Sequence, residues 1–322
     1  MALLKSFNRK AKIENESGLS TNSNLNPGRF FNKNGTPNIE ISGMSFLESI
    51  NWFHSLLNMP RWKFASLIFF FFFSINLFFA FVYLFIGVEH LDGMVAYTNL
   101  EKFGEAFFFS AQTFTTVGYG RINPIGFWTS TTAAIEALCG LLSLALATGL
   151  LYGRFARPKA YIRYSKNALF APFNDGVALM FRMVPFTKNY LMNVEAKATI
   201  AMKVFEDGMQ KNKFYNAHLD VSKVTTMTSN WTIVHPINEE SPLYNLNKED
   251  IENAAIEILV FVQGFDESFS NIVISRTSYT SDEFIYGAKF LPMYGPSQNG
   301  LSTTLLLDKL NDYENATINV KY

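Results

Sequence analysis

ASLIFFFFFSINLFFAFVYLFIG, residues 65–87, is the strongest structural signal in this sequence. The stretch runs for more than 20 residues without a charged side chain. An α-helix needs about 20 apolar residues to cross the hydrocarbon core of a bilayer. The bulk of the phenylalanines at 69–73 suits a surface that faces lipid. We therefore expect a first transmembrane helix over about 65–87.

A second apolar stretch lies at about 127–153 and includes AAIEALCGLLSLALATGLLY. It is also long enough to cross a bilayer. Its one acid, Glu136, must be neutralised or hydrogen-bonded if it faces protein inside the membrane. The sequence thus predicts two transmembrane helices.

Basic residues lie on one side of these two stretches. The connecting segment 88–126 carries only Lys102 and Arg121 against four acids. Cytoplasmic flanks of membrane spans are enriched in Lys and Arg. We therefore expect both termini in the cytoplasm and a multi-pass protein of the cell (inner) membrane. The flanking cations are Arg61, Lys63, Arg154, Arg157, Lys159 and Arg163.

Composition argues against several other classes of protein. The chain has 322 residues, enough for about two domains. Its formal net charge is zero, which argues against a nucleic-acid partner. The single Cys139 allows no intrachain disulfide or cysteine-based zinc site, and the four histidines show no ligand spacing, so we expect no cofactor. Residues 1–44, rich in Asn, Ser, Gly and Lys, predict a disordered cytoplasmic tail.

The connecting segment contains the apolar, helix-compatible sequence LEKFGEAFFFSAQTF, residues 100–114. It is too short to span a bilayer, and a re-entrant segment is tolerated only where protein or a water-filled cavity surrounds it. We expect a half-helix at about 103–115 that dips into the membrane and an extended return. The C-terminal end of this helix would direct partial negative charge toward a central cavity and favour a cation there.

The extended return contains Thr116-Val117-Gly118-Tyr119-Gly120, in which no side chain is ionisable near neutral pH. Glycine at alternate positions permits left-handed dihedral angles, so successive carbonyls can face one axis and replace the water around a monovalent cation. The Thr116 hydroxyl would add an oxygen, while Val117 and Tyr119 would pack behind the strand. Four copies close the ring, which predicts a homotetramer. This pentapeptide is the same as the known filter sequence of potassium channels, and the match implies K⁺ as the ion bound at Thr116, Val117, Gly118 and Tyr119.

The C-terminal half has a different character. Residues 156–322 contain strand-like runs separated by turn signals, which predicts a cytoplasmic β-sandwich domain. No further span with regularly spaced Arg or Lys is present, so a voltage sensor is not expected. The clearest runs are IEILVFVQGF (256–265), NIVISRTSY (271–279) and EFIYGAKFL (283–291).

Three longer stretches resemble the inward-rectifier potassium channel family, and the resemblance extends from about Phe46 to about Phe290. They are GRFARPKAYIRYSKNALFAPFNDGVALMFRM (153–183), WTIVHPINEESPLYNL (231–246) and SRTSYTSDEFIYGAKF (275–290). The first most resembles the prokaryotic, KirBac-like branch, which the lack of paired cysteines in the outer loop also suits. The resemblance implies a homotetramer in which two transmembrane helices enclose a re-entrant pore helix. It also implies an interfacial slide helix at about 45–60 and an immunoglobulin-like cytoplasmic domain.

The resemblance also implies roles for residues of the second transmembrane stretch, matched through Gly140 and the Arg157-Pro158 pair. Gly140 falls where the family places a flexible glycine. Leu144 falls where strong rectifiers carry an acid, which implies weak rectification. Tyr152 matches the gate residue at the bundle crossing, where four rings could close the pore by excluding water. The plainer alternative for Tyr152 is a residue of the interfacial aromatic belt.

Three residues near the filter bear on how it is supported. Glu136 matches an acid that prokaryotic relatives carry behind the filter, and we interpret it as a packing and hydrogen-bonding residue rather than an ion ligand. Gln112 stands where many relatives have a bracing Glu, and Arg121 stands where many potassium channels have an Asp. These departures leave the bracing of the filter open.

The six flanking cations have two interpretations. In the family, residues at this level bind acidic lipid headgroups and bias the gate, and each cation near an anionic surface gains about 1 kcal/mol. The alternative is that they only set the topology of the chain.

Two other functions remain as alternatives. One is a ligand-gated channel of another subfamily, or a weakly selective cation channel in which Arg121 or Phe114 loosens the filter. Ligand-gated relatives usually append a nucleotide-binding domain, but residues 160–322 show no Gly-rich turn that opens a helix. The other is a membrane-anchored enzyme or receptor, for which residues 160–322 offer no nucleophile–base spacing. The sequence therefore favours a channel that is not an enzyme.

Overall fold

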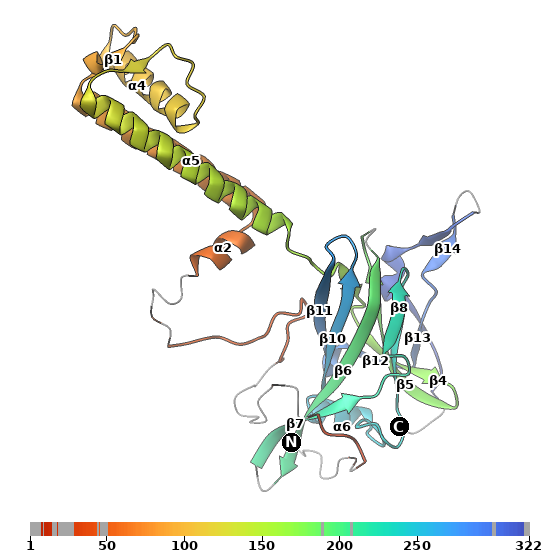
Figure 1. The fold of residues 1–322 in the computed structure, drawn as a ribbon. Coiled ribbons are helices and arrows are strands. Elements are labelled where there is room, and N and C mark those ends of the chain that lie inside the picture. The colour runs from red at the N-terminus through yellow and green to blue at the C-terminus, as the bar shows by residue number, and fades with distance from the viewer. Residues whose placement is uncertain are drawn as a thin grey trace. The chain divides into compact units, whose positions relative to one another are not determined.

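The structure is a computed structural model that describes residues 8, 10–14, 18, 29–43, 45, 51–187, 190–206, 209–297 and 301–318. The chain divides into two compact units (Figure 1). We call Ser42–Arg157 the helical unit. The β unit comprises Pro158–Tyr322 together with the N-terminal residues Met1–Ile41.

Two long apolar helices form most of the helical unit (Figure 1). Helix α3 (Arg61–Ile86) ends at Gly87, whose φ of 120° suits a residue without a Cβ. Helix α5 (Phe127–Phe155) follows Gly126. By length and composition both are able to cross a membrane, as the sequence predicts. The shorter elements are α2 (Trp52–Asn58), the 3₁₀ helix η2 (Val88–His90) and α4 (Asn99–Phe114).

Helix α4 lies between the long helices in the sequence and starts four residues before the expected position 103. The reason is a capping box at its N-terminus. The Thr98 hydroxyl accepts a hydrogen bond from the Glu101 amide at 3.2 Å, and the Glu101 carboxylate accepts one from the Thr98 amide, also at 3.2 Å. These two bonds satisfy backbone donors that the first turn of a helix leaves free.

A small apolar core joins α3, α4 and the loops around them. The short strands β1 (Leu91–Asp92) and β2 (Asn123–Pro124) pair antiparallel beside it. Most of the phenylalanines at 69–73 are exposed in the single chain, as expected of a lipid-facing surface. The buried core residues are Phe79, Ala80, Tyr83, Leu91, Ala106, Phe109 and Ile122.

The β unit contains two five-stranded sheets (Figure 1). One has the order β11-β10-β6-β7, with β8 also paired to β6; the other has the order β12-β4-β5-β3, with β9 also paired to β5. Within the described residues every pairing of these sheets is antiparallel except β12 with β4. The strands of the first sheet are β6 (Leu191–Glu206), β7 (Met209–Ala217), β8 (Lys223–Met227), β10 (Glu257–Asp266) and β11 (Asn271–Thr280). Those of the second are β3 (Ile162–Tyr164), β4 (Ala168–Phe173), β5 (Gly176–Pro185), β9 (Trp231–Pro236) and β12 (Phe284–Tyr286).

One hydrophobic core is shared by the two sheets. Phe170 and Leu179 contribute to it from the second sheet, and Ile200 and Val260 contribute from the first. The run expected at 283–291 is interrupted at Gly287, whose φ is 68°, so it forms two short strands instead of one. The remaining elements are α6 (Lys248–Asn253), η3 (Ser281–Glu283), β13 (Ala288–Phe290), β14 (Tyr294–Pro296), β15 (Thr303–Leu305), η4 (Leu307–Asn311) and β16 (Tyr313–Asn315).

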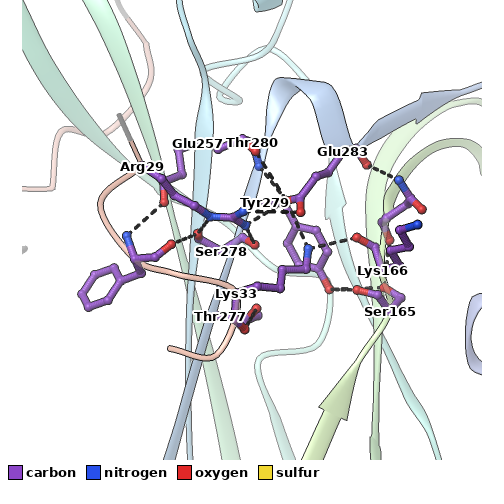
Figure 2. Close-up of polar contacts among 12 residues, drawn as sticks. Arg29, Lys33, Ser165, Lys166, Glu257, Thr277, Ser278, Tyr279, Thr280 and Glu283 are labelled. Atoms are coloured by element: carbon purple, nitrogen blue, oxygen red, sulfur yellow. Dashed lines mark hydrogen bonds and ion pairs between the residues drawn. The ribbon is translucent and has the colours of Figure 1, made fainter. Parts of the chain in front are cut away.

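Part of the N-terminal segment is docked on the β unit, which differs from the disorder expected through residue 44. Figure 2 shows Arg29 and Lys33 converging on Glu283 beside strand β11. Arg29 Nη2 lies 2.8 Å from a Glu283 carboxylate oxygen, and Lys33 Nζ lies 3.1 Å from the same oxygen. Lys33 Nζ also lies 3.7 Å from the centre of the Tyr279 ring. Burial lowers the pKa of Lys33 to about 8.

Two further contacts hold the N-terminal segment. The backbone amide of Phe30 donates to the buried Glu257 carboxylate at 2.7 Å, and burial is the main cause that raises the pKa of this carboxyl. Nearer the start of the chain, Ile13 forms a β-bridge with Tyr215 on β7. The composition of the tail did not reveal these contacts because each partner lies some 200 residues or more away in the sequence.

Candidate functional site

The candidate site is the segment that follows α4, residues 115–120. Positive φ angles occur at alternate residues, with 59° at Thr116, 50° at Gly118 and 79° at Gly120. Alternation between left-handed and ordinary dihedral angles turns successive peptide planes toward the same side. The sequence anticipates this behaviour at the glycines. Thr116, which is not a glycine, adopts it as well.

The end of α4 anchors this segment through backbone hydrogen bonds. The Gln112 carbonyl accepts from the Val117 amide at 2.9 Å and from the Gly118 amide at 3.3 Å. The Thr113 carbonyl accepts from the Thr116 amide at 3.0 Å. These bonds occupy the inner amides of the segment. Gln112 thus supports the segment through its backbone, and its half-buried side chain forms no hydrogen bond with a residue that the structure describes.

The side chains of the segment lie open in the single chain. Val117 is 53% exposed and Tyr119 is 79% exposed. The prediction that these side chains pack behind the strand concerns an assembly of several chains, and it stays a prediction.

Glu136 lies at the centre of a buried polar network that joins α3, α4 and α5. The Tyr83 hydroxyl donates to its carboxylate at 2.6 Å, and the Ser110 hydroxyl also hydrogen-bonds to it. Ser110 Oγ lies 3.0 Å from Asn76 Oδ1, and the Asn76 amide donates to the Phe72 carbonyl at 2.6 Å. The Glu136 carboxylate is thus buried and hydrogen-bonded to α3 and α4, and its role as a support behind the filter stays a prediction.

Three members of this network were not singled out from the sequence. Asn76 and Tyr83 lie within the first apolar stretch, and Ser110 lies within the short helix. Polar side chains inside membrane spans are costly and are retained where they find partners. This rule could have identified Asn76 as a buried polar residue near Glu136, which it reaches through Ser110, whereas Tyr83 and Ser110 gave no comparable signal in the sequence.

The outer end of the segment is held by an ion pair. Arg121, directly after Gly120, contacts the Glu105 carboxylate on α4. The Asn123 side-chain amide donates to the Gly120 carbonyl at 3.2 Å. From the sequence, Arg121 was a departure from an Asp and a candidate for loosening the filter, and Glu105 was one of the four acids of the connecting segment. The structure brings them together as a brace.

The second apolar helix carries Gly140, Leu144 and Tyr152. Helix α5 runs through Gly140 without a break. A Cβ at this position would collide with backbone atoms of Phe114 at the end of α4, so glycine permits a close approach of the two helices. Leu144 is 64% exposed and Tyr152 is 74% exposed in the single chain.

The six flanking cations have different surroundings. Arg61 and Lys63 are exposed on the first turn of α3. Arg154 and Arg157 are half-buried and hydrogen-bond to α2 or the residues that follow it. In the β unit, Lys159 is exposed, and the guanidinium of Arg163 lies over the Phe186 ring at 4.6 Å.

A groove in the β unit includes one of these cations. Lys159 and Arg276 line it together with Asn34, Gly35 and Ser275. Its polar and cationic lining suits an anionic group. Among the described residues no group of three His, Cys, Asp or Glu side chains could hold a metal ion.

Two apolar helices on either side of a short helix and a filter-like segment, together with a β-rich C-terminal part, define a two-span membrane channel subunit. Residues 31–158 match the model of the inward rectifier potassium channel transmembrane domain, and residues 162–305 match that of the inward rectifier potassium channel C-terminal domain. The chain belongs to the inward rectifier potassium channel family. This family consists of membrane-embedded potassium channels, so the alternative of an enzyme is wrong.

Individual relatives agree with this assignment. The inward rectifier potassium channel Kirbac3.1 of Paramagnetospirillum magnetotacticum is 32% identical over 277 residues, covering 84% of this chain and 91% of that protein. ATP-sensitive inward rectifier potassium channel 12 of Gallus gallus is 26% identical over 298 residues, covering 84% of this chain and 68% of the relative. The crystal structure of Spo0M, a sporulation control protein from Bacillus subtilis, gives a TM-score of only 0.23 at 9% identity over 38% of this chain and 49% of that one, too low to inform the fold.

Proposed function

We propose that this protein conducts K⁺ selectively and passively through the axis of a homotetramer. The carbonyls of Thr116, Val117, Gly118 and Tyr119 replace the hydration water of the ion, and the Thr116 hydroxyl adds a further oxygen. The observation that carries the proposal is the alternation of positive φ at 116, 118 and 120 directly after α4. In this assignment α4 is the pore helix, and the β unit is an immunoglobulin-like cytoplasmic domain.

The gate in this proposal lies at Tyr152. Its large ring projects from α5 into open space in the single chain, so four copies are free to meet around an axis and exclude water. Leu144 lines the cavity above it. Because Leu144 carries no charge that would hold Mg²⁺ or a polyamine, we expect weak rectification. A steep loss of outward current when spermine is added to the cytoplasmic side of excised patches would contradict this.

Anionic lipid is the proposed modulator. Arg61 and Lys63 are exposed on α3, and Lys159 is exposed in the β unit. The groove beside Lys159 gives an acidic headgroup a second cation, Arg276. Arg157 and Arg163 complete the proposed lipid set. Arg154, which the sequence also places in this set, is left out because its guanidinium is hydrogen-bonded to backbone carbonyls. Both termini then lie on the cytoplasmic side of the cell (inner) membrane.

Reconstitution in liposomes tests this function. We expect barium-sensitive rubidium uptake that greatly exceeds sodium uptake, and a change in the rate when anionic lipid is added. Wild-type vesicles that take up sodium as readily as rubidium would refute selective conduction. An unchanged lipid response in the double variant Arg157→Gln, Lys159→Gln would leave these cations with a topological role only.

A further inference from the structure

The C-terminal end of helix α2 has an unusual partner in the helical unit. The last carbonyls of any helix lack partners within the helix. Here the Arg154 guanidinium, from the last turn of α5, donates to the Leu56 carbonyl at 2.6 Å and to the Met59 carbonyl at 2.7 Å. One guanidinium therefore binds the end of α2 at two points.

The same guanidinium contacts a third element. Its central carbon lies 4.4 Å from the centre of the Phe64 ring, a buried side chain in the first turn of α3. Arg154 thus links the end of α2, the start of α3 and the end of α5. Its position in the sequence is two residues after Tyr152.

Direct packing reinforces this junction. The Leu57 side chain is buried, and a Cβ placed on Gly153 would lie 3.2 Å from Leu57 Cδ2. Arg157, one turn further along the chain, donates to the Asn58 side-chain oxygen at 2.8 Å. Helix α2 itself exposes Trp52 and Phe53, bulky apolar side chains suited to a membrane surface.

We propose that Arg154 is a positioning residue that couples α2 mechanically to the gate end of α5, rather than a ligand for lipid headgroups. This inference rests on the proposed gate at Tyr152. Two of the guanidinium donors are committed to backbone carbonyls, and its cationic charge favours the negative end of a helix dipole. The planar fork of arginine can serve two carbonyls at once, whereas the single ammonium of lysine is a point charge. A movement of α2 at the membrane surface would therefore reach α5 through this residue.

Arg154→Lys and Arg154→Gln test the coupling in the full-length channel, with Lys63→Gln as the matched control for the exchange measurement. Lys63 is a nearby exposed cation at the start of α3, so its loss changes charge without touching the α2 carbonyls. Hydrogen–deuterium exchange of residues 52–60 reports on the junction, and rubidium uptake in liposomes of increasing anionic lipid content reports on gating. We expect both Arg154 variants to raise amide exchange about tenfold or more and to flatten the lipid response. Lys63→Gln should leave the exchange unchanged.

Arg154→Lys distinguishes a positioning role from lipid binding, because it keeps the positive charge but loses the planar guanidinium. If amide exchange of residues 52–60 is as slow in Arg154→Lys as in the wild type, the proposal is overturned. A lipid response that is retained in this variant would also overturn it. A covalent link between α2 and α5 supplies the converse test. In the Arg154→Gln variant, Leu57→Cys and Gly153→Cys introduce two thiols, and Cys139→Ala removes the native one. Joining the two new thiols with a short bifunctional reagent should restore the lipid response. No recovery in the linked protein would also overturn it. If the wild type shows no selective rubidium uptake, the proposed function is refuted instead. The hydrogen–deuterium exchange result does not depend on ion conduction, so the two failures can be distinguished.

Discussion

Glu105 and Arg121 offer the clearest test at the scale of single residues, because their ion pair ties the residue after Gly120 to helix α4. We expect Glu105→Gln to lower the ratio of rubidium to sodium uptake several-fold, since the outer end of the filter loses its brace. The pair is partly exposed, so its effect on stability should stay within about 1 kcal/mol.

The exchange variant Glu105→Arg with Arg121→Glu controls for the loss of charge. It restores an ion pair of opposite polarity and should recover much of the selectivity ratio. Unaltered selectivity in Glu105→Gln, measured in the same liposomes, would mean that the ion pair is incidental to the filter.

Gly140 is a second residue whose role the structure specifies. The resemblance implies a flexible glycine, but the Cβ of Gly140→Ala would meet backbone atoms of Phe114, which cannot yield as a side chain tip can. We expect Gly140→Ala to destabilise the protein by about 1–3 kcal/mol through overpacking. Gly149→Ala is the matched control on the same helix, because a Cβ there meets nothing within 4 Å. Thermal unfolding in detergent should show a lower midpoint for the first variant only. Equal midpoints would indicate that α5 withdraws from α4 freely.

At the scale of elements, patterns local in the sequence were the predictable ones. Length and apolarity predict α3 and α5, and glycine spacing predicts the positive φ angles at 118 and 120. The interruption at Gly287 was missed because a strand-like run gives no sign of where the chain must turn. The docking of Arg29 and Lys33 depends on Glu283, about 250 residues away, and no local pattern reports such a contact.

Strand β9 provides a pH-dependent element in the β unit. His235 is buried: its Nδ1 lies 2.7 Å from the His218 carbonyl oxygen, and its Nε2 lies 2.8 Å from the Ser241 hydroxyl. The carbonyl can only accept, so Nδ1 carries the proton and Nε2 accepts from Ser241. Burial is the main cause that lowers the pKa of His235 to about 4, from 6.5.

Because the unfolded chain binds this proton more readily, stability falls as pH falls from about 6.5 toward 4. The loss attributable to His235 is on the order of 3 kcal/mol at the acid end. We expect the midpoint of thermal unfolding, followed by tryptophan fluorescence, to drop over this range in the wild type. His235→Gln should show a shallower drop, while the exposed His218→Gln serves as the control. A drop of the same size in His235→Gln would show that other groups cause it.

At the scale of the whole molecule, the exposed side chains of a single subunit indicate which contacts the other chains of the proposed tetramer would supply. More than half of each of four side chains is exposed, although we place two of them in the proposed filter and two in the proposed cavity and gate: Val117, Tyr119, Leu144 and Tyr152. A filter built from four chains also brings carbonyl oxygens together, and these repel one another unless a cation lies between them. In the proposed tetramer, the ion would therefore contribute to the association of the chains.

We therefore expect K⁺ to stabilise the proposed tetramer. Dissociation of the chains would release the bound ions. Each tenfold rise in K⁺ concentration above saturation should therefore raise the free energy of dissociation by about 1.4 kcal/mol for each ion released. Native mass spectrometry of heated samples should show complexes of four chains, each of 36.5 kDa, persisting to higher temperature in K⁺ than in Na⁺ at equal ionic strength. Tyr152→Ala leaves the filter intact and should keep the full K⁺ effect, whereas Gly118→Ala, which places a Cβ at a φ of 50°, should weaken it. Equal persistence in the two salts would show that the carbonyls of different chains do not share an ion.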